Sequence, residues 1–168
     1  MSRVKPGVVL CVDDEEQIRV VVARALYADG HTVLTAPDAE TAMLALSQNP
    51  VDVIITDQHM PRVSGIDLLK MVRVRYPRVV RIMLTGDTNP ETPVRSINEG
   101  EVYRFIRKPW SNADLRTIVS LACEVAKLEQ EKKYLITLLR NQLASPRDPA
   151  EVEAEILLLA EEELEGRD

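Results

Sequence analysis

Short apolar runs alternate with longer segments of helical pattern along the first two thirds of the chain. Five runs are rich in β-branched residues, and they cover residues 8–12, 31–35, 51–56, 79–85 and 102–106. Three of them are apolar almost throughout, which is typical of parallel strands that are covered on both faces. The pattern therefore predicts five strands of a buried parallel sheet.

The segments between these runs have the spacing and the flanking residues of helices. We expect helices at about 15–29, 38–48, 65–75, 90–99 and from 112 onward. Gly30 and Gly100 follow the first and the fourth segment, where C-terminal caps are expected. Asp38 can cap the second helix, and Asn89 with Pro90 can begin the fourth. Right-handed crossovers then imply an α/β fold, a doubly wound (βα)₅ parallel sheet with helices on both faces.

The last helical segment continues beyond the length that such a domain needs. No Gly or Pro occurs from Ala113 to about Leu143, a stretch of roughly 45 Å as a helix. Apolar residues recur there with heptad spacing, broken by Lys132, at Ile118, Leu121, Val125, Leu128, Leu135 and Leu139. We expect residues 124–144 to be an extended helix that pairs with a second copy as a coiled coil, giving a homodimer. The alternative is a helix whose first part packs on the sheet and whose remainder is a solvated overhang.

The acidity of the chain is concentrated after this helix. The 168 residues carry a net charge of −6. Residues 146–168 hold nine acids and two bases, whereas residues 1–145 hold 18 acids and 19 bases. Neither part has the basic stripe of a nucleic-acid surface, so we expect no direct nucleic-acid binding. We expect residues 145–168 to be a linker and an acidic amphipathic tail, which either folds back as a helix or stays partly disordered.

The composition is that of a globular protein with an aliphatic core, since 45% of the residues are apolar and only 4% are aromatic. No apolar run approaches the ~18 residues of a membrane span, and acidic residues directly follow the first run, unlike in a signal peptide. We therefore expect a cytoplasmic protein with no membrane partner. Cys11 and Cys123 lack metal or redox spacing and are expected to be buried, and His31 and His59 are too few for a zinc site.

Polar residues of complementary kinds follow four of the five predicted strands. Asp13 and Asp14 follow the first strand, Asp57 ends the third, Thr85 ends the fourth, and Lys108 lies just past the fifth. Because ligands of an open parallel sheet bind beyond the carboxyl ends of its strands, these side chains should meet in one crevice. Grouped carboxylates need a cation, and oxygen ligands select Mg²⁺. With an ammonium and a hydroxyl opposite, the set predicts a phosphoryl site in which the central Asp57 is the nucleophile.

Five stretches of the sequence form a combination of motifs that is highly specific for one protein family. They are residues 9–15 (VLCVDDE), 54–61 (IITDQHMP), 64–69 (SGIDLL), 83–86 (MLTG) and 105–110 (FIRKPW). On these stretches, residues 7 to about 123 resemble the receiver domain of two-component response regulators. The resemblance implies a flavodoxin-like fold for a receiver domain over residues 1–123.

The resemblance also implies a role for each acidic residue. Asp57 would be the phosphoacceptor, and its phosphoryl group would come from a histidine kinase or a histidine phosphotransfer protein. Asp14 and Asp57 would bind Mg²⁺ directly, together with the backbone carbonyl of His59, and Asp13 would act through water. By the same resemblance, His59 and Asp87 occupy positions that tune the lifetime of the phosphoryl group in the family. The alternative for His59 is an exposed loop residue with no such role. Such a domain is not an enzyme, although it assists its own phosphorylation and dephosphorylation.

A conformational switch is implied in the same way. Thr85 and Lys108 would contact the phosphoryl group, and the bond from Lys108 to Pro109 would be cis. On phosphorylation the hydroxyl of Thr85 would move toward the phosphoryl group, and the ring of Phe105 would rotate inward. This ring lacks the hydroxyl of the commoner Tyr, and its alternative role is that of a plain core aromatic. The helix expected at 90–99 is poor in helix formers, so this face should shift at low cost.

Other interpretations of the same residues stay open. A phosphotransferase of the haloacid dehalogenase type also uses a strand-end Asp, but it needs a second Asp where this chain has His59. A pseudo-receiver binds partners without phosphorylation, although here every site residue is present. Residues 97–106 resemble receivers joined to HD-GYP phosphodiesterases or to hydrogenase-type transcription activators. The chain therefore either signals through its tail to an unknown downstream protein or is a receiver fragment of a larger regulator.

Overall fold

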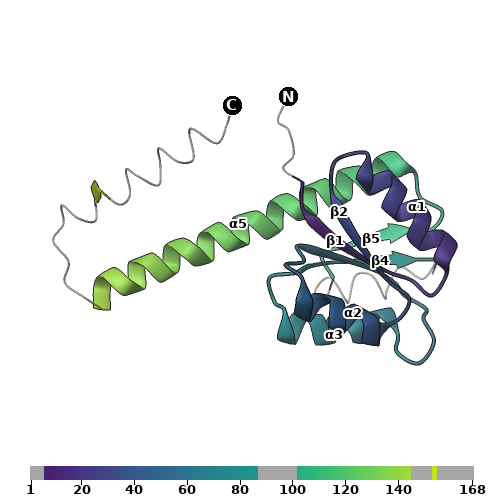
Figure 1. The fold of residues 1–168 in the computed structure, drawn as a ribbon, viewed down its shortest axis with the longest axis horizontal. Helices are drawn as coiled ribbons and strands as arrows, with labels where there is room; N and C mark the ends of the chain where they lie inside the picture. Colours follow the sequence, from purple (N-terminus) through teal and green to yellow (C-terminus); the bar gives the residue numbers. More distant parts are fainter. Residues whose placement is uncertain (1–5, 87–101, 145–152, 155–168) are drawn as a thin grey trace. The chain divides into compact units, whose positions relative to one another are not determined.

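The computed structural model describes residues 6–86, 102–144 and 153–154 (Figure 1). The helix expected at 90–99, its caps, and Asp87 lie outside these residues. The chain divides into two units, Met1–Gln130 and Glu131–Asp168. The first unit contains the sheet and its helices, and the second contains the end of the last helix.

Five parallel strands form one sheet in the order β2-β1-β3-β4-β5. Their bounds are Val8–Val12 (β1), Thr32–Ala36 (β2), Val53–Asp57 (β3), Val80–Thr85 (β4) and Arg104–Arg107 (β5). The doubly wound topology predicted from the apolar runs is confirmed, and the strand ends differ from prediction by at most two residues. The strand order reverses between β1 and β3, the place where an open sheet of this kind binds its ligands.

The described helices begin and end close to where the sequence places them. Their bounds are Glu16–Tyr27 (α1), Ala39–Gln48 (α2), Gly65–Arg75 (α3) and Asn112–Ala144 (α5). The carboxylate of Asp38 accepts a hydrogen bond of 2.8 Å from the N–H of Thr41, which confirms the predicted cap of α2. Gly30 has a φ of +81° after α1, a conformation that favours glycine, and its N–H donates to the carbonyl of Tyr27.

The two faces of the sheet have separate aliphatic cores. Helices α1 and α5 cover one face and α2 and α3 cover the other (Figure 1). Val22 and Leu26 of α1 meet Leu115 and Val119 of α5 in the first core. Leu68 of α3 is fully buried in the second. Because β1, β3 and β4 lie between these layers, they are almost entirely apolar, as the sequence pattern indicates.

Helix α5 is one continuous helix of 33 residues, so the long final helix is confirmed. Within the first unit, two polar contacts join it to the amino-terminal edge of the sheet. The ammonium of Lys127 donates to the carbonyl of Pro6 at 3.1 Å, and the Gln130 amide donates to the Asp52 carboxylate at 3.4 Å. These contacts continue to residue 130, beyond the expected boundary at 123.

Both cysteines are free and buried, as expected. Burial raises the pKa of Cys11 to about 12 and that of Cys123 to about 11, so neither thiol ionises near neutral pH. Among the described helices, none has the length and apolar character required to cross a membrane.

Candidate functional site

The carboxyl ends of four strands bring the predicted polar residues together. Asp57 is the last residue of β3 and Thr85 the last of β4, while Asp13 directly follows β1. The N–H of Lys108, just after β5, donates to the carbonyl of Thr85 at 2.8 Å, which extends the pairing of β4 with β5. The strand register therefore determines which side chains share this edge of the sheet.

The ammonium of Lys108 joins the two buried carboxylates. Its Nζ lies 2.6 Å from Oδ1 of Asp57 and 3.6 Å from Oδ2 of Asp13. Burial alone would lower the pKa of Lys108, but the hydrogen bond and charge of Asp57, with the charges of Asp13 and Glu15, raise it overall. The lysine is therefore a permanent cation at the centre of the site. The bond from Lys108 to Pro109 is cis, as the resemblance implied.

Asp13 is completely buried and only partly satisfied. Its Oδ1 accepts a hydrogen bond of 2.9 Å from the N–H of Glu15, whereas its Oδ2 has no hydrogen-bond partner among the described residues. Burial raises the pKa of Asp13 above its usual value, although the Glu15 N–H and the charge of Lys108 oppose the shift. A buried oxygen with unused acceptor capacity is suited to bind a hydrated cation.

The backbone of the acidic pair is held by a side chain of α1. One guanidinium nitrogen of Arg19 lies 2.6 Å from the carbonyl oxygen of Asp13 and 3.2 Å from that of Asp14. The carboxylate of Asp14 belongs to an exposed residue beside the buried one. Arg19 thus determines the course of the loop that presents both acids.

The second oxygen of Asp57 is also bound. Oδ2 accepts a hydrogen bond of 2.9 Å from the backbone N–H of His59, while the His59 residue is exposed. Lys108 and this N–H hold the carboxylate in one orientation. The next helix begins directly against it, because a Cβ on Gly65 would overlap the carbonyl oxygen of Asp57. Only glycine allows this close approach.

The expected Mg²⁺ ligands, Asp13, Asp14 and Asp57, lie at this end of the sheet. Within the described part of the chain, no three His, Cys, Asp or Glu side chains form a metal-binding group. A magnesium site needs fewer than three such side chains, because Mg²⁺ keeps several waters and is commonly held by one or two carboxylates. Oδ2 of Asp13, which lacks a hydrogen-bond partner among the described residues, the carboxylate of Asp57 and the exposed Asp14 provide an all-oxygen set of that kind. These residues therefore fit the ion.

The two expected switch residues differ in their surroundings. Thr85 is buried, and its hydroxyl donates a hydrogen bond to the side-chain oxygen of Gln58. The ring of Phe105 is half-buried and packs against the core that α2 and α3 cover. Whether this ring rotates stays a prediction.

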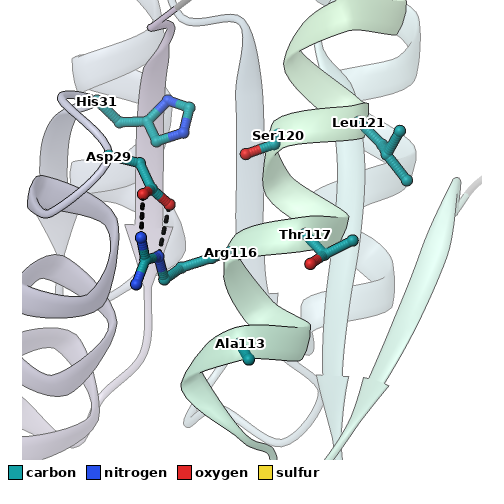
Figure 2. Close-up of a pocket in the computed structure, with 7 residues that line it drawn as sticks. All are labelled: Asp29, His31, Ala113, Arg116, Thr117, Ser120 and Leu121. Carbon is teal, nitrogen blue, oxygen red and sulfur yellow. Dashed lines mark hydrogen bonds and ion pairs between the residues drawn. The ribbon is translucent and has the colours of Figure 1, made fainter. Parts of the chain in front are cut away.

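Sequence reasoning missed Gln58 and Arg19, since neither residue type has a fixed role at a strand end. It also missed a cavity of about 560 Å³ between helix α5 and the loop that joins α1 to β2 (Figure 2). There the guanidinium of Arg116 pairs through two nitrogens with the Asp29 carboxylate, and His31 lies buried beside them. Asp29 and His31 precede β2, so this cavity does not belong to the carboxyl-end site.

The fold and the site define the class of protein to which the chain belongs. It is a doubly wound α/β protein with buried aspartates and a lysine at the carboxyl ends of its strands. Residues 9–120 match the response regulator receiver domain family, and the chain belongs to that family. Phosphorylation and dependence on Mg²⁺ are general features of this family, whose domains interact with histidine kinases and are generally not enzymes.

Individual relatives agree with this assignment. The chain is 38% identical over 137 residues to the hydrogenase transcriptional regulatory protein HoxA of Cupriavidus necator. The aligned region covers 82% of this chain and 28% of HoxA. The structure of NtrX from Brucella abortus is similar with a TM-score of 0.72 and 33% identity, covering 78% of this chain and 30% of NtrX. The signal receiver domain of an HD domain-containing protein from Pseudomonas fluorescens has a TM-score of 0.69 and 34% identity, with 78% of this chain and 95% of that one covered. The chain thus spans less than a third of HoxA and of NtrX.

Proposed function

We propose that this receiver is phosphorylated on Asp57 by a histidine kinase or a histidine phosphotransfer protein. The single observation that carries the proposal is the 2.6 Å contact between Lys108 Nζ and Asp57 Oδ1, beside a second buried carboxylate. A carboxylate beside a fixed cation can accept a phosphoryl group whose charge the same cation offsets. A pseudo-receiver has no need for such an arrangement.

In the proposed reaction an oxygen of Asp57 attacks the phosphorus of a phosphohistidine. The new O–P bond forms as the P–N bond breaks, and the imidazole nitrogen leaves with the electron pair. Lys108 offsets charge on the phosphoryl oxygens, while the His59 N–H orients the carboxylate. Asp14, Asp57 and the His59 carbonyl would hold Mg²⁺, with Asp13 acting through water. When bound, the ion offsets further charge on the phosphoryl group.

The test uses a small phosphoryl donor, so that no partner protein is needed. Acetyl phosphate with Mg²⁺ should add one phosphoryl group that is acid-labile and sensitive to hydroxylamine, detected by intact-protein mass spectrometry. Asp57→Asn or a chelator should abolish it. Asp67→Asn, which changes an exposed acid on α3, is the matched control and should label normally. Persistent labelling of Asp57→Asn would overturn the assignment, and failure of the wild-type chain to label would favour the pseudo-receiver.

We further propose that the phosphoryl group acts through Thr85 and Phe105 to change the surface offered to a downstream protein. The relatives HoxA and NtrX are regulators, and the part that matches this chain is less than a third of each protein's length. This proportion supports a receiver that controls an output domain, either in a larger chain or on a separate partner. We also propose that the protein acts in the cytoplasm.

Residues 1–123, 124–144 and 145–168 are proposed to act as receiver, coiled coil and acidic tail. The support for a dimer through α5 is a set of exposed leucines on that helix. Leu121, Leu128 and Leu135 are each at least half exposed and recur every seven residues. A second copy of the helix would cover them, and phosphorylation would then alter how two receivers join one rod.

A further inference from the structure

Gln58 holds the hydroxyl that the proposed switch requires. Asp57 pairs with Leu84 across β3 and β4, so the next residues of the two strands, Gln58 and Thr85, lie opposite each other. The hydroxyl of Thr85 donates to the side-chain oxygen of Gln58. The side chain that accepts this bond comes from the residue directly after the proposed phosphoacceptor.

The backbone of Gln58 is fixed on both sides. Its N–H donates to the carbonyl of Leu84 at 3.0 Å, and its carbonyl accepts from the N–H of Gly65 at 3.0 Å. One bond joins the residue to β4 and the other to the start of α3. A Cβ on Gly65 would overlap the Asp57 carbonyl oxygen, so the start of α3 packs directly against this segment. The amide is therefore presented to Thr85 from a backbone that is hydrogen-bonded to β4 and to α3.

A threonine hydroxyl has one proton to donate. That proton can bind the Gln58 amide oxygen or an oxygen of a phosphoryl group on Asp57, but not both. We propose that Gln58 is a positioning residue that competes with the phosphoryl group for the Thr85 hydroxyl, and so sets the equilibrium between the inactive and active conformations. This inference rests on the proposed function, in which Asp57 carries the phosphoryl group.

The strength of the competition can be estimated from the bond that must break. A neutral hydrogen bond of this kind changes an equilibrium by about two- to tenfold in a folded protein. Replacing the amide by an apolar group of similar size removes this acceptor of the Thr85 proton and should favour the active state by that factor. The substitution of Gln58 should affect the equilibrium only when the Thr85 hydroxyl is present. This dependence distinguishes the proposed competition from general damage to the site.

The experiment measures the affinity of the full chain for beryllium trifluoride, a tetrahedral mimic of a phosphoryl group on a carboxylate, in saturating Mg²⁺. Fluorescence of Trp110, the single tryptophan and two residues beyond Lys108, reports occupancy. Gln58→Leu and Gln58→Met should each bind about two- to tenfold more tightly than the wild type. In a Thr85→Val background, which removes the hydroxyl but keeps the volume, the same changes should have no effect. The methyl resonance of Thr85 in Gln58→Leu should also shift toward its position in the bound state.

Each result decides one question. Tighter binding that disappears in Thr85→Val supports the competition. Unchanged or weaker binding by both Gln58 variants overturns it, as does an effect of equal size in both backgrounds. If the wild-type chain itself fails to bind beryllium trifluoride, the proposed function falls and this inference falls with it. Binding by the wild type without a Thr85-dependent effect of Gln58 overturns the inference alone.

Discussion

The ammonium of Lys108 lies 2.6 Å from Asp57, the residue proposed to receive the phosphoryl group. This cation stands where a metal ion would also be attracted, so its removal should not weaken Mg²⁺ binding. We predict that Lys108→Ala binds Mg²⁺ with equal or severalfold higher affinity, because a like charge has been removed. Titration followed by Trp110 fluorescence measures this.

The same variant should lose the response to phosphorylation, since no cation remains to contact the phosphoryl oxygens. Lys70→Ala removes an exposed lysine that pairs with Asp67 on α3, and it should behave like the wild type in both assays. Loss of Mg²⁺ binding in Lys108→Ala alone would contradict the geometry described for the site.

Gly65 gives a second prediction, about folding. A methyl group there would overlap the Asp57 carbonyl, so Gly65→Ala must displace either the start of α3 or the end of β3. We expect a loss of about 1–3 kcal/mol in the free energy of unfolding, measured with urea. Phosphorylation of Asp57 should also slow.

Gly86→Ala is the matched control for this prediction. A Cβ at Gly86 meets no heavy atom within 4 Å among the described residues, and this position follows Thr85 at the same edge of the sheet. Its effect on stability should stay within about 0.5 kcal/mol. Equal destabilisation by the two substitutions would show that the close approach at Gly65 is not the cause.

The sequence predicted the sheet and the site because both follow from local patterns. Apolar runs determine strands, and parallel strands bring Asp13, Asp57 and Lys108 to one edge whatever the details of packing. The cap at Asp38 was predictable for the same reason, since its partner is three residues away. Element bounds were less accurate, because strand ends depend on pairing with neighbours rather than on the run itself.

Contacts between distant residues were not predictable in this way. The Asp29 and Arg116 side chains are 87 positions apart, and their pairing depends on how α5 crosses α1. The bond between Gln58 and Thr85 depends on register, because a slip of one residue would place another side chain opposite the hydroxyl. Sequence periodicity carries no signal for either contact.

The buried imidazole of His31 predicts a dependence of stability on pH. Burial lowers its pKa below the ordinary value of 6.5, and the nearby ammonium of Lys127 acts in the same direction, while Asp29 and Asp52 oppose the shift. Its Nδ1 accepts a hydrogen bond of 3.1 Å from the N–H of Gly7, which requires an unprotonated nitrogen. The folded state therefore favours the neutral ring.

The direction of the effect follows from linkage. The stability that His31 contributes is complete above pH ~6.5 and is lost as the pH falls below that value toward the lowered pKa of the folded state. His31→Asn keeps an acceptor for the Gly7 N–H but does not titrate, so its unfolding free energy should fall less steeply between about pH 6.5 and 5. Identical slopes in the wild type and His31→Asn would show that His31 does not titrate with folding.

The last prediction concerns the leucines of α5 and the proposed dimer. The heptad stripe is divided by the fold, because Ile118 and Val125 pack against the receiver's own core. Leu128 and Leu135 are instead 62% and 58% exposed. Burying a leucine stabilises a complex by roughly 1.5–3 kcal/mol, so covering both in each chain is sufficient to oppose the cost of a lysine in the stripe. We therefore expect the full chain to sediment as a dimer.

The double substitution Leu128→Gln and Leu135→Gln should shift the protein to a monomer while leaving phosphorylation of Asp57 intact. The control Lys133→Gln changes an exposed residue on the same helix and should leave the dimer unchanged. A truncation after Gln130 tests the same point from the other side, because it keeps the contacts of Lys127 and Gln130 with the sheet and removes Leu135. It should be a monomer. If the full chain is itself monomeric at tens of micromolar, the coiled coil is wrong, and the acidic tail is left as the segment that covers these leucines within one chain.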